Sequence, residues 1–179
     1  NKKSSKNDDV TSSKGEGVFE KIACIGTGKM CQAMVDPMIN KHIQPCHKLM
    51  VYDVNVESMQ AFQELYNVQT ASSVPECVKN ADLVVLAVKP QNLTDDFFLE
   101  LSKKAILLSV IAGKTMRVYE RGGFSKIVRS MPNTPAMIGQ GMTVWSATNN
   151  MTKEERQKVQ RVLSSCGSSV RFVTWTVQR

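Results

Sequence analysis

The sequence predicts an α/β fold: a Rossmann-like, doubly wound and mostly parallel sheet of about eight strands with helices on both faces. Three observations lead to this prediction. Short apolar runs rich in β-branched residues alternate with helix-like segments from Lys21 onward. Some of these runs, such as residues 83–88, are apolar without alternation, as expected of strands covered on both faces. A glycine turn lies between the first such run and the helix-like segment that follows it.

Each strand is expected from a short apolar run bounded by polar or turn-forming residues. The expected strands cover residues 21–25, 48–52, a very short run near Val68, 82–88, 105–111, 126–129, 143–147 and 170–173. Two of the intervening helices begin with a capping-box pattern, in which a hydroxyl and a carboxylate satisfy free backbone donors. The two pairs are Ser73 with Glu76, and Thr152 with Glu155.

Length and composition set the domain organisation. The 179 residues, of which 42% are hydrophobic, fit one domain with a sizeable core. We expect a disordered tail over residues 1–20, because this stretch mixes Ser, Lys, Asp and Gly without an apolar run. The α/β domain is expected over residues 21–173, and residues 174–179 form an atypical end.

Charge and cysteine usage narrow the classes of ligand and partner. The net charge of +7 favours an anionic ligand. We expect no nucleic-acid partner, because the basic last helix carries no interleaved aromatic residues, and no membrane partner, because no apolar run reaches about 18 residues. The five cysteines lack a C-x-x-C pair, which predicts no metal site and a reducing compartment, the cytoplasm, with an organelle left open.

The glycine turn is the first motif that carries chemistry. Gly26 and Gly28 frame Thr27 between the first strand and the first helix, and Cys31 stands at the usual third-glycine position. The first glycine allows a tight turn, and the second lets backbone amides approach a pyrophosphate at the positive end of the helix. The turn therefore predicts a dinucleotide site.

An acidic residue follows the second strand. Asp53 lies 25 positions after Gly28, where a carboxylate commonly accepts hydrogen bonds from the adenosine ribose of NAD. A turn or cap residue is the alternative, and both remain open. If Asp53 faces the ribose, its charge should disfavour the additional phosphate of NADP.

Three further motifs follow later strands: Val-Lys-Pro-Gln at 88–91, Ser-Val-Ile-Ala-Gly at 109–113 and Arg-Ser-Met-Pro-Asn-Thr-Pro-Ala at 129–136. Together with the glycine turn, their order and spacing resemble the pyrroline-5-carboxylate reductase family over residues 21–173. This resemblance implies an NAD(P)-binding Rossmann domain with NADPH or NADH as cofactor. By resemblance, the cofactor contacts are Ile25, Gly26, Thr27, Gly28, Lys29 and Met30 around the pyrophosphate, Asp53 and Asn55 at the adenosine ribose, Val88, Lys89 and Pro90 at the nicotinamide ribose, and Ala112 behind the nicotinamide.

The resemblance assigns no certain catalytic residue. Two prolines fix an extended backbone around Asn133 and Thr134, which would hold these side chains near the ring pocket. A rigid turn whose polar side chains serve only the backbone is the competing interpretation. Lys89 and Pro90 have a structural alternative too, as a solvated strand end and a strand terminator.

The implied reaction is hydride transfer from NAD(P)H to 1-pyrroline-5-carboxylate, a cyclic imino acid, which gives L-proline in proline biosynthesis. The family has a second, helical domain that forms the dimer and holds the substrate, and no match to it is expected here. We therefore expect this chain to be the cofactor-binding half, to bind reduced nicotinamide nucleotide with slow or no turnover, and to form a homo-oligomer only with that second domain. The alternatives are a related imine or hydroxy-acid reductase and a non-catalytic dinucleotide-binding module.

Overall fold

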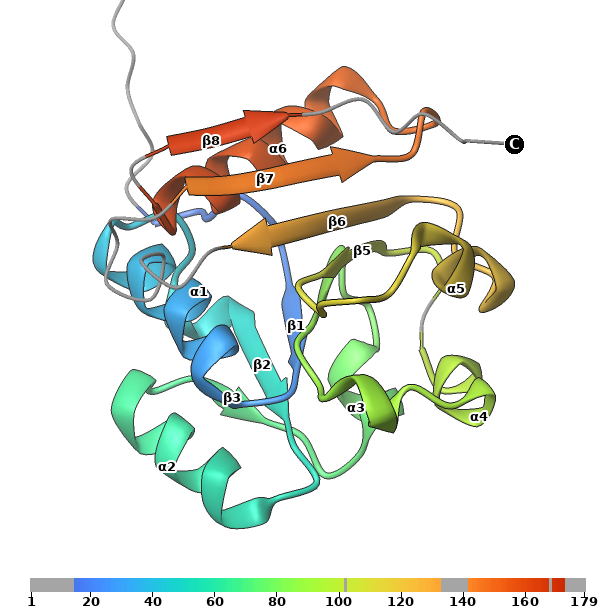
Figure 1. The fold of residues 1–179 in the computed structure, drawn as a ribbon. Helices are drawn as coiled ribbons and strands as arrows, with labels where there is room; N and C mark the ends of the chain where they lie inside the picture. The colour runs from blue at the N-terminus through green and yellow to red at the C-terminus, as the bar shows by residue number, and fades with distance from the viewer. Residues whose placement is uncertain (1–14, 102, 133–141, 168, 173–179) are drawn as a thin grey trace, which may run out of the picture.

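The computed structural model describes residues 15–101, 103–132, 142–167 and 169–172. These residues contain one eight-stranded sheet in the order β3-β2-β1-β4-β5-β6-β7-β8 (Figure 1). The predicted fold class is confirmed, and every expected strand is found within a few residues of its predicted position. The strands are β1 (Ile22–Ile25), β2 (Leu49–Tyr52), β3 (Gln69–Thr70), β4 (Leu83–Leu86), β5 (Ile106–Ser109), β6 (Ile127–Pro132), β7 (Met142–Ala147) and β8 (Ser169–Phe172).

The strand order reverses beside β1. From β1 the chain moves outward to β2 and β3, and then returns to place β4 on the other side of β1. Ile22 at the start of β1 consequently pairs in parallel with both Leu49 and Leu83. The pairing of β6 with β7 is antiparallel, and the other six described pairings are parallel. Ligands of open α/β sheets bind where the strand order reverses, outside the carboxyl ends of the strands.

Helices cover both faces of the sheet. One face packs against α1 (Lys29–Asn40), α2 (Val56–Tyr66) and α6 (Lys153–Ser165), and the other packs against α3 (Val74–Val78), α4 (Asp95–Leu99) and α5 (Met116–Arg121) (Figure 1). Two short 3-10 helices, η1 (Cys46–Lys48) and η2 (Pro90–Asn92), lie in the connections. No helix among the described residues has both the length and the apolar character needed to cross a membrane.

The central strands show why their sequences do not alternate. In β1, Ile22 and Cys24 enter the core beneath α1 and α6, whereas Ala23 and Ile25 enter the core beneath α3. All four side chains are buried, as are all four in β4. A parallel strand that is covered on both faces must be apolar at every position, which explains the unbroken run at residues 83–86.

The two predicted capping boxes have different outcomes. The Thr152 hydroxyl accepts from the Glu155 amide at 3.1 Å and a Glu155 carboxylate oxygen accepts from the Thr152 amide at 2.9 Å, so this box is confirmed. Ser73 accepts from the Glu76 amide, but the Glu76 carboxylate binds the amide and hydroxyl of Ser72 instead of returning to Ser73. The box at Ser73 is therefore only half formed.

The packed structure begins before residue 21. Val18 and Phe19 are buried, and the buried Gln44 side chain accepts from the Phe19 amide at 3.1 Å and donates to the Phe19 carbonyl at 2.8 Å. The prediction of a disordered tail through residue 20 is thus wrong for these two residues. The composition of the segment does not reveal that Phe19 is held by Gln44, which lies 25 positions further along the chain.

The turn between β1 and α1 has little steric freedom. Gly26 has a φ of +98°, and a Cβ atom there would lie 2.6 Å from the Ala87 carbonyl oxygen that follows β4. Gly28 differs, because its φ is −74° and a Cβ atom would meet no atom within 4 Å. Only the first glycine is required by the fold itself.

Replacement of the two glycines separates these roles. Gly26→Ala should lower the free energy of unfolding by about 3 kcal/mol, which corresponds to a fall in Tm of about 6–12 °C, because it combines a backbone clash with a left-handed φ. Gly28→Ala is the matched control and should change stability by less than about 1 kcal/mol. Urea denaturation of both variants measures the difference. Equal losses in the two variants would contradict the steric assignment.

Candidate functional site

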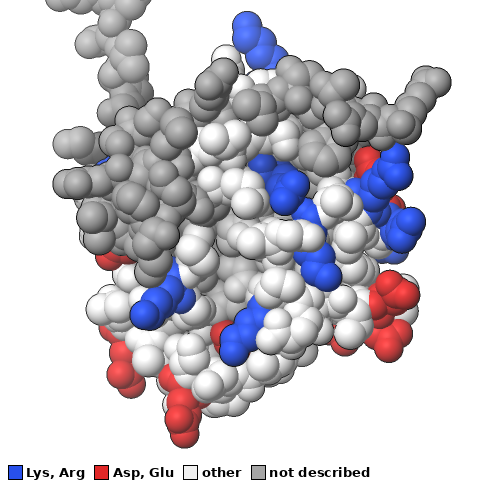
Figure 2. All heavy atoms as spheres, viewed as in Figure 1, with Lys and Arg blue, Asp and Glu red and all other residues white. Residues whose placement is uncertain are grey.

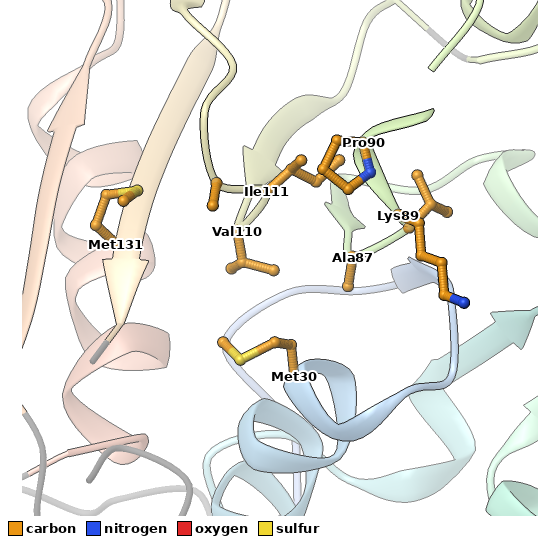
Figure 3. Close-up of a pocket in the computed structure, with 9 residues that line it drawn as sticks. Met30, Ala87, Lys89, Pro90, Val110, Ile111 and Met131 are labelled. Carbon is orange, nitrogen blue, oxygen red and sulfur yellow. The ribbon is translucent and has the colours of Figure 1, made fainter. Parts of the chain in front are cut away.

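Two adjoining cavities open at the carboxyl ends of the parallel strands. The larger, of about 650 Å³, lies between the ends of β1, β2 and β4 and the start of α2. The smaller, of about 340 Å³, lies between the ends of β4, β5 and β6 and the start of α1 (Figure 3). Ala87, Val88 and Lys89 line both cavities. The glycine turn therefore stands where two cavities meet at the reversal of strand order.

The glycine turn is fixed from two sides. The Gly26 amide donates to the Tyr52 carbonyl of β2 at 2.8 Å, and Ala87, whose carbonyl excludes a side chain at position 26, donates to the Ile25 carbonyl at 2.9 Å. Ile25, Gly26 and Gly28 all line the larger cavity, and their contact with a pyrophosphate stays a prediction. The turn thus presents its backbone to the cavity without a side chain between them.

The first turn of α1 is open to an anion. Gly28 is the N-cap residue, no side chain caps this helix end, and the first turn contains no acidic residue. The unpaired amides of a helix start carry a partial positive charge, which favours phosphate or carboxylate groups. Lys29 is the first residue of this helix, and Met30 lines the smaller cavity. A twelve-residue helix with a bare N-terminus therefore points at the junction of the cavities.

Asp53 faces the glycine turn. One carboxylate oxygen accepts from the Thr27 amide at 2.7 Å and from the Thr27 hydroxyl at 2.8 Å, and the other accepts from the Asn55 amide at 2.9 Å. The Asn55 side chain caps α2 by accepting from the Ser58 amide at 3.0 Å. These hydrogen bonds are the ones expected if Asp53 acts as a turn residue, which is one of the two roles that the sequence left open. Both residues also line the larger cavity, and their contact with a ribose stays a prediction.

The predicted nicotinamide-side residues surround the smaller cavity. Figure 3 shows Lys89 and Pro90 on one side, Met131 of β6 on the opposite side, and Val110 and Ile111 between them. The walls are apolar except at Lys89, which is exposed. Ala112 completes the wall after β5. The motifs at 88–91 and 109–113 are therefore brought together, although they are about 20 residues apart in the chain.

Several lining residues were not named individually as cofactor contacts from the sequence, although three of them belong to the motifs at 109–113 and 129–136. Met131, Val110 and Ile111 line the smaller cavity, and Ser58 and Phe97 line the larger one. The signal that would find the first three is their position at or just beyond a parallel strand end. Asn133 and Thr134, the predicted contributors to the ring pocket, lie outside the described residues.

Two of the cysteines near the turn are packing groups. A hydrogen bond with Cys31 and burial both raise the pKa of the Cys24 thiol well above its ordinary value. Burial raises the pKa of the Cys77 thiol to about 12. Thiols that remain protonated at neutral pH are poor nucleophiles. Cys24 packs in the core beneath α1 and Cys77 packs in the core on the opposite face of the sheet, and neither offers a reactive thiolate.

Charge on the visible face also favours an anionic ligand. Figure 2 shows Lys and Arg side chains across the middle of this face, whereas most Asp and Glu side chains lie near its rim. The overall charge of +7 has the same sign. Such a distribution raises the local concentration of anions before they contact the site.

Comparisons with known proteins agree with the motifs. A family described as NADP oxidoreductase coenzyme F420-dependent matches residues 21–113. Pyrroline-5-carboxylate reductase of Pisum sativum is 31% identical over 151 residues, which are 82% of this chain and 55% of that protein. The Aquifex aeolicus reductase is 31% identical over 160 residues, covering 85% of this chain and 57% of that protein.

A solved structure shows the same arrangement. The pyrroline-5-carboxylate reductase of Coxiella burnetii superposes with a TM-score of 0.79 at 27% identity and covers 87% of this chain and 59% of that one. The chain thus spans a little more than half the length of the relatives that it matches. The resemblance expected from the motifs is confirmed over this length. Since the family model matches more than half of its residues, the chain belongs to the family described as NADP oxidoreductase coenzyme F420-dependent, and over this domain it resembles the pyrroline-5-carboxylate reductases.

Proposed function

We propose that this chain is the cofactor-binding domain of a pyrroline-5-carboxylate reductase, which transfers a hydride from NADPH or NADH to 1-pyrroline-5-carboxylate and forms L-proline. The observation that carries the proposal is the bare N-terminus of α1 behind a two-glycine turn, at the junction of two cavities. The names of the relatives support the choice of substrate.

The pyrophosphate would lie on the turn from Ile25 to Met30. Here the extended Gly28 leaves space for a close approach, and the amides of the first turn of α1 supply donors. Lys29 and Lys89 would add positive charge on either side of the phosphates. The phosphates thereby face donors and cations with no acidic side chain in the first turn of the helix.

The two cavities would separate the two halves of the dinucleotide. The larger one has polar groups at Asp53, Asn55 and Ser58 for a ribose and apolar groups at Val74 and Phe97 for a base. The smaller one would take the nicotinamide. In this arrangement, Val88, Lys89 and Pro90 flank the nicotinamide ribose, and Ala112 backs the ring.

The bound cofactor supplies the hydride and its acceptor is the carbon of the C=N bond. The protein contributes alignment of the two rings and exclusion of water by the apolar walls of the smaller cavity. Lys89 is the only titratable side chain among its described lining residues. An imine that is already protonated needs no proton donor at its nitrogen, so a cavity wall with few titratable side chains is compatible with the reaction. Asn133 and Thr134, which follow β6, are proposed to contact the substrate ring.

Partners and compartment extend the proposal. The substrate is a small cyclic imino acid, and neither nucleic acid nor a membrane is proposed as a partner. Oligomer formation would depend on the part of the longer relatives that this chain does not span. The cytoplasm is proposed as the compartment, because the described cysteines are all free thiols.

Nucleotide binding gives the first test. The chain should bind NADPH, and Gly28→Ala should weaken binding at least about tenfold, because its Cβ would occupy the space assigned to the pyrophosphate. Titration of NADPH fluorescence measures both affinities. A chain without affinity up to about 1 mM contradicts nucleotide binding, and unchanged affinity in the variant places the pyrophosphate elsewhere.

A pair of lysine substitutions tests whether the nucleotide binds at the carboxyl ends of the strands. Lys89→Gln should weaken NADPH binding about threefold at low salt, and the effect should shrink as salt is added, because the contribution is a screened surface charge. Lys104→Gln is the charge-matched control, since Lys104 lines a separate cavity with Asp82 and Ile106 at the amino ends of the strands. Equal effects of the two substitutions would show a general charge effect instead.

A further inference from the structure

We propose that Asp53 is a positioning residue that fixes the glycine turn through Thr27, and that it does not select between NADH and NADPH. This inference rests on the proposed function, because it assigns a role within the same nucleotide site. It replaces the expectation that a carboxylate after the second strand would disfavour the phosphate of NADP.

The hydrogen bonds of Asp53 define the role. Three of them use both carboxylate oxygens: two come from Thr27 and one comes from the Asn55 amide. Thr27 lies between the two glycines and is only 1% exposed. Hydrogen bonds to a charged acceptor are stronger than neutral ones, particularly away from water. Asp53 thus holds the middle of the turn by both its backbone and its side chain.

Ser58 extends this network, which we define as Thr27, Asp53, Asn55 and Ser58. Because a carboxylate only accepts, the Thr27 hydroxyl proton is directed to Asp53. The 3.0 Å contact between the Thr27 and Ser58 hydroxyls therefore has Ser58 as its donor. The Ser58 amide in turn binds the Asn55 side chain. The network joins the turn before α1 to the turn before α2.

Fixing Thr27 fixes the amides on either side of it. Gly26 is held by the Tyr52 carbonyl, whereas no side chain holds Gly28. A residue that must be ordered on binding costs about 1–2 kcal/mol of conformational entropy. Ordering the turn before the ligand arrives removes that cost from binding. The network should therefore raise the affinity for any ligand whose pyrophosphate lies on the turn.

The same geometry argues against selection by Asp53. NADH and NADPH share the pyrophosphate, so a turn held in place favours both. The Asp53 carboxylate lines the larger cavity, but it is half-buried and both of its oxygens already accept hydrogen bonds, from Thr27 and Asn55. The exposed residues of this loop are Val54, at 78%, and Asn55. Loss of the Asp53 carboxylate should accordingly lower the affinities for NADH and NADPH by the same factor.

The test compares three variants with the wild-type chain by fluorescence titration of NADPH and NADH. Thr27→Val removes the hydroxyl with little change in volume and should lower the affinity for both cofactors about fivefold. Thr27→Ser keeps the hydroxyl, and its affinities should lie within about twofold of those of the wild type. Asp53→Asn should weaken both at least about tenfold, with the ratio of the two affinities unchanged within about twofold. Rescue by serine is not expected if Thr27 only fills space.

A second measurement needs no nucleotide. Amide hydrogen exchange at Thr27 and Gly28 in the free protein should be at least about fivefold faster in Thr27→Val than in the wild type, and close to the wild type in Thr27→Ser. If Thr27→Val does not fold, Ser58→Ala can replace it. This variant removes only the hydrogen bond from Ser58 to Thr27 and should show a smaller increase in the exchange rates of the same two amides.

The outcomes separate the two proposals. A change of more than about fivefold in the NADPH-to-NADH ratio on Asp53→Asn makes Asp53 the selector and overturns the inference. Unchanged affinity and unchanged exchange in Thr27→Val overturn it as well. If the wild type binds neither cofactor, the proposed function fails and the cofactor role of Asp53 fails with it, even where the exchange data show the turn to be held.

Discussion

The approach of Gly26 to the Ala87 carbonyl is the contact on which the geometry of the site depends. β1 pairs with both β2 and β4, so the chain that leaves β1 must pass between the ends of its two neighbours. A side chain at Gly26 would collide with Ala87, which lines both cavities. One backbone contact therefore sets the distance between the turn, the start of α1 and the wall that both cavities share.

Around that contact, the polar groups at the start of α1 come mostly from the backbone and the apolar surface of the smaller cavity comes from side chains. The anion-facing groups are mostly backbone amides at the start of α1, whose first turn has no acidic residue. Asp53, the acidic residue that contacts the turn, accepts hydrogen bonds from the Thr27 amide and hydroxyl. The smaller cavity is walled by apolar side chains from the ends of β4, β5 and β6, with Lys89 at its edge. In the proposed function, the cofactor phosphates and the nicotinamide ring would thus be held by different parts of one surface at the strand ends.

Local patterns predicted what depends on local physics. The unbroken apolar run in β4, the glycines of the turn and the Thr152 capping box all follow from burial or from neighbours three residues away. What the sequence did not reveal depends on distant partners: Gln44 holds Phe19 across 25 positions, and Asp53 holds Thr27 across 26. Met131 joined the smaller cavity only because β6 lies beside β5. Asp53 shows the limit most clearly, because its position in the sequence fits a ribose ligand and a turn residue equally well.

In the proposed function, a nicotinamide dinucleotide lies along the carboxyl ends of the strands, with its pyrophosphate on the glycine turn. Backbone amide NMR shifts during titration with NADPH test this placement of the nucleotide. Large shifts are expected at Gly28, Lys29 and Ala112, and none at Asp82 or Lys104 at the opposite edge of the sheet. Shifts confined to the opposite edge, or no shifts at the turn under saturating NADPH, would contradict it.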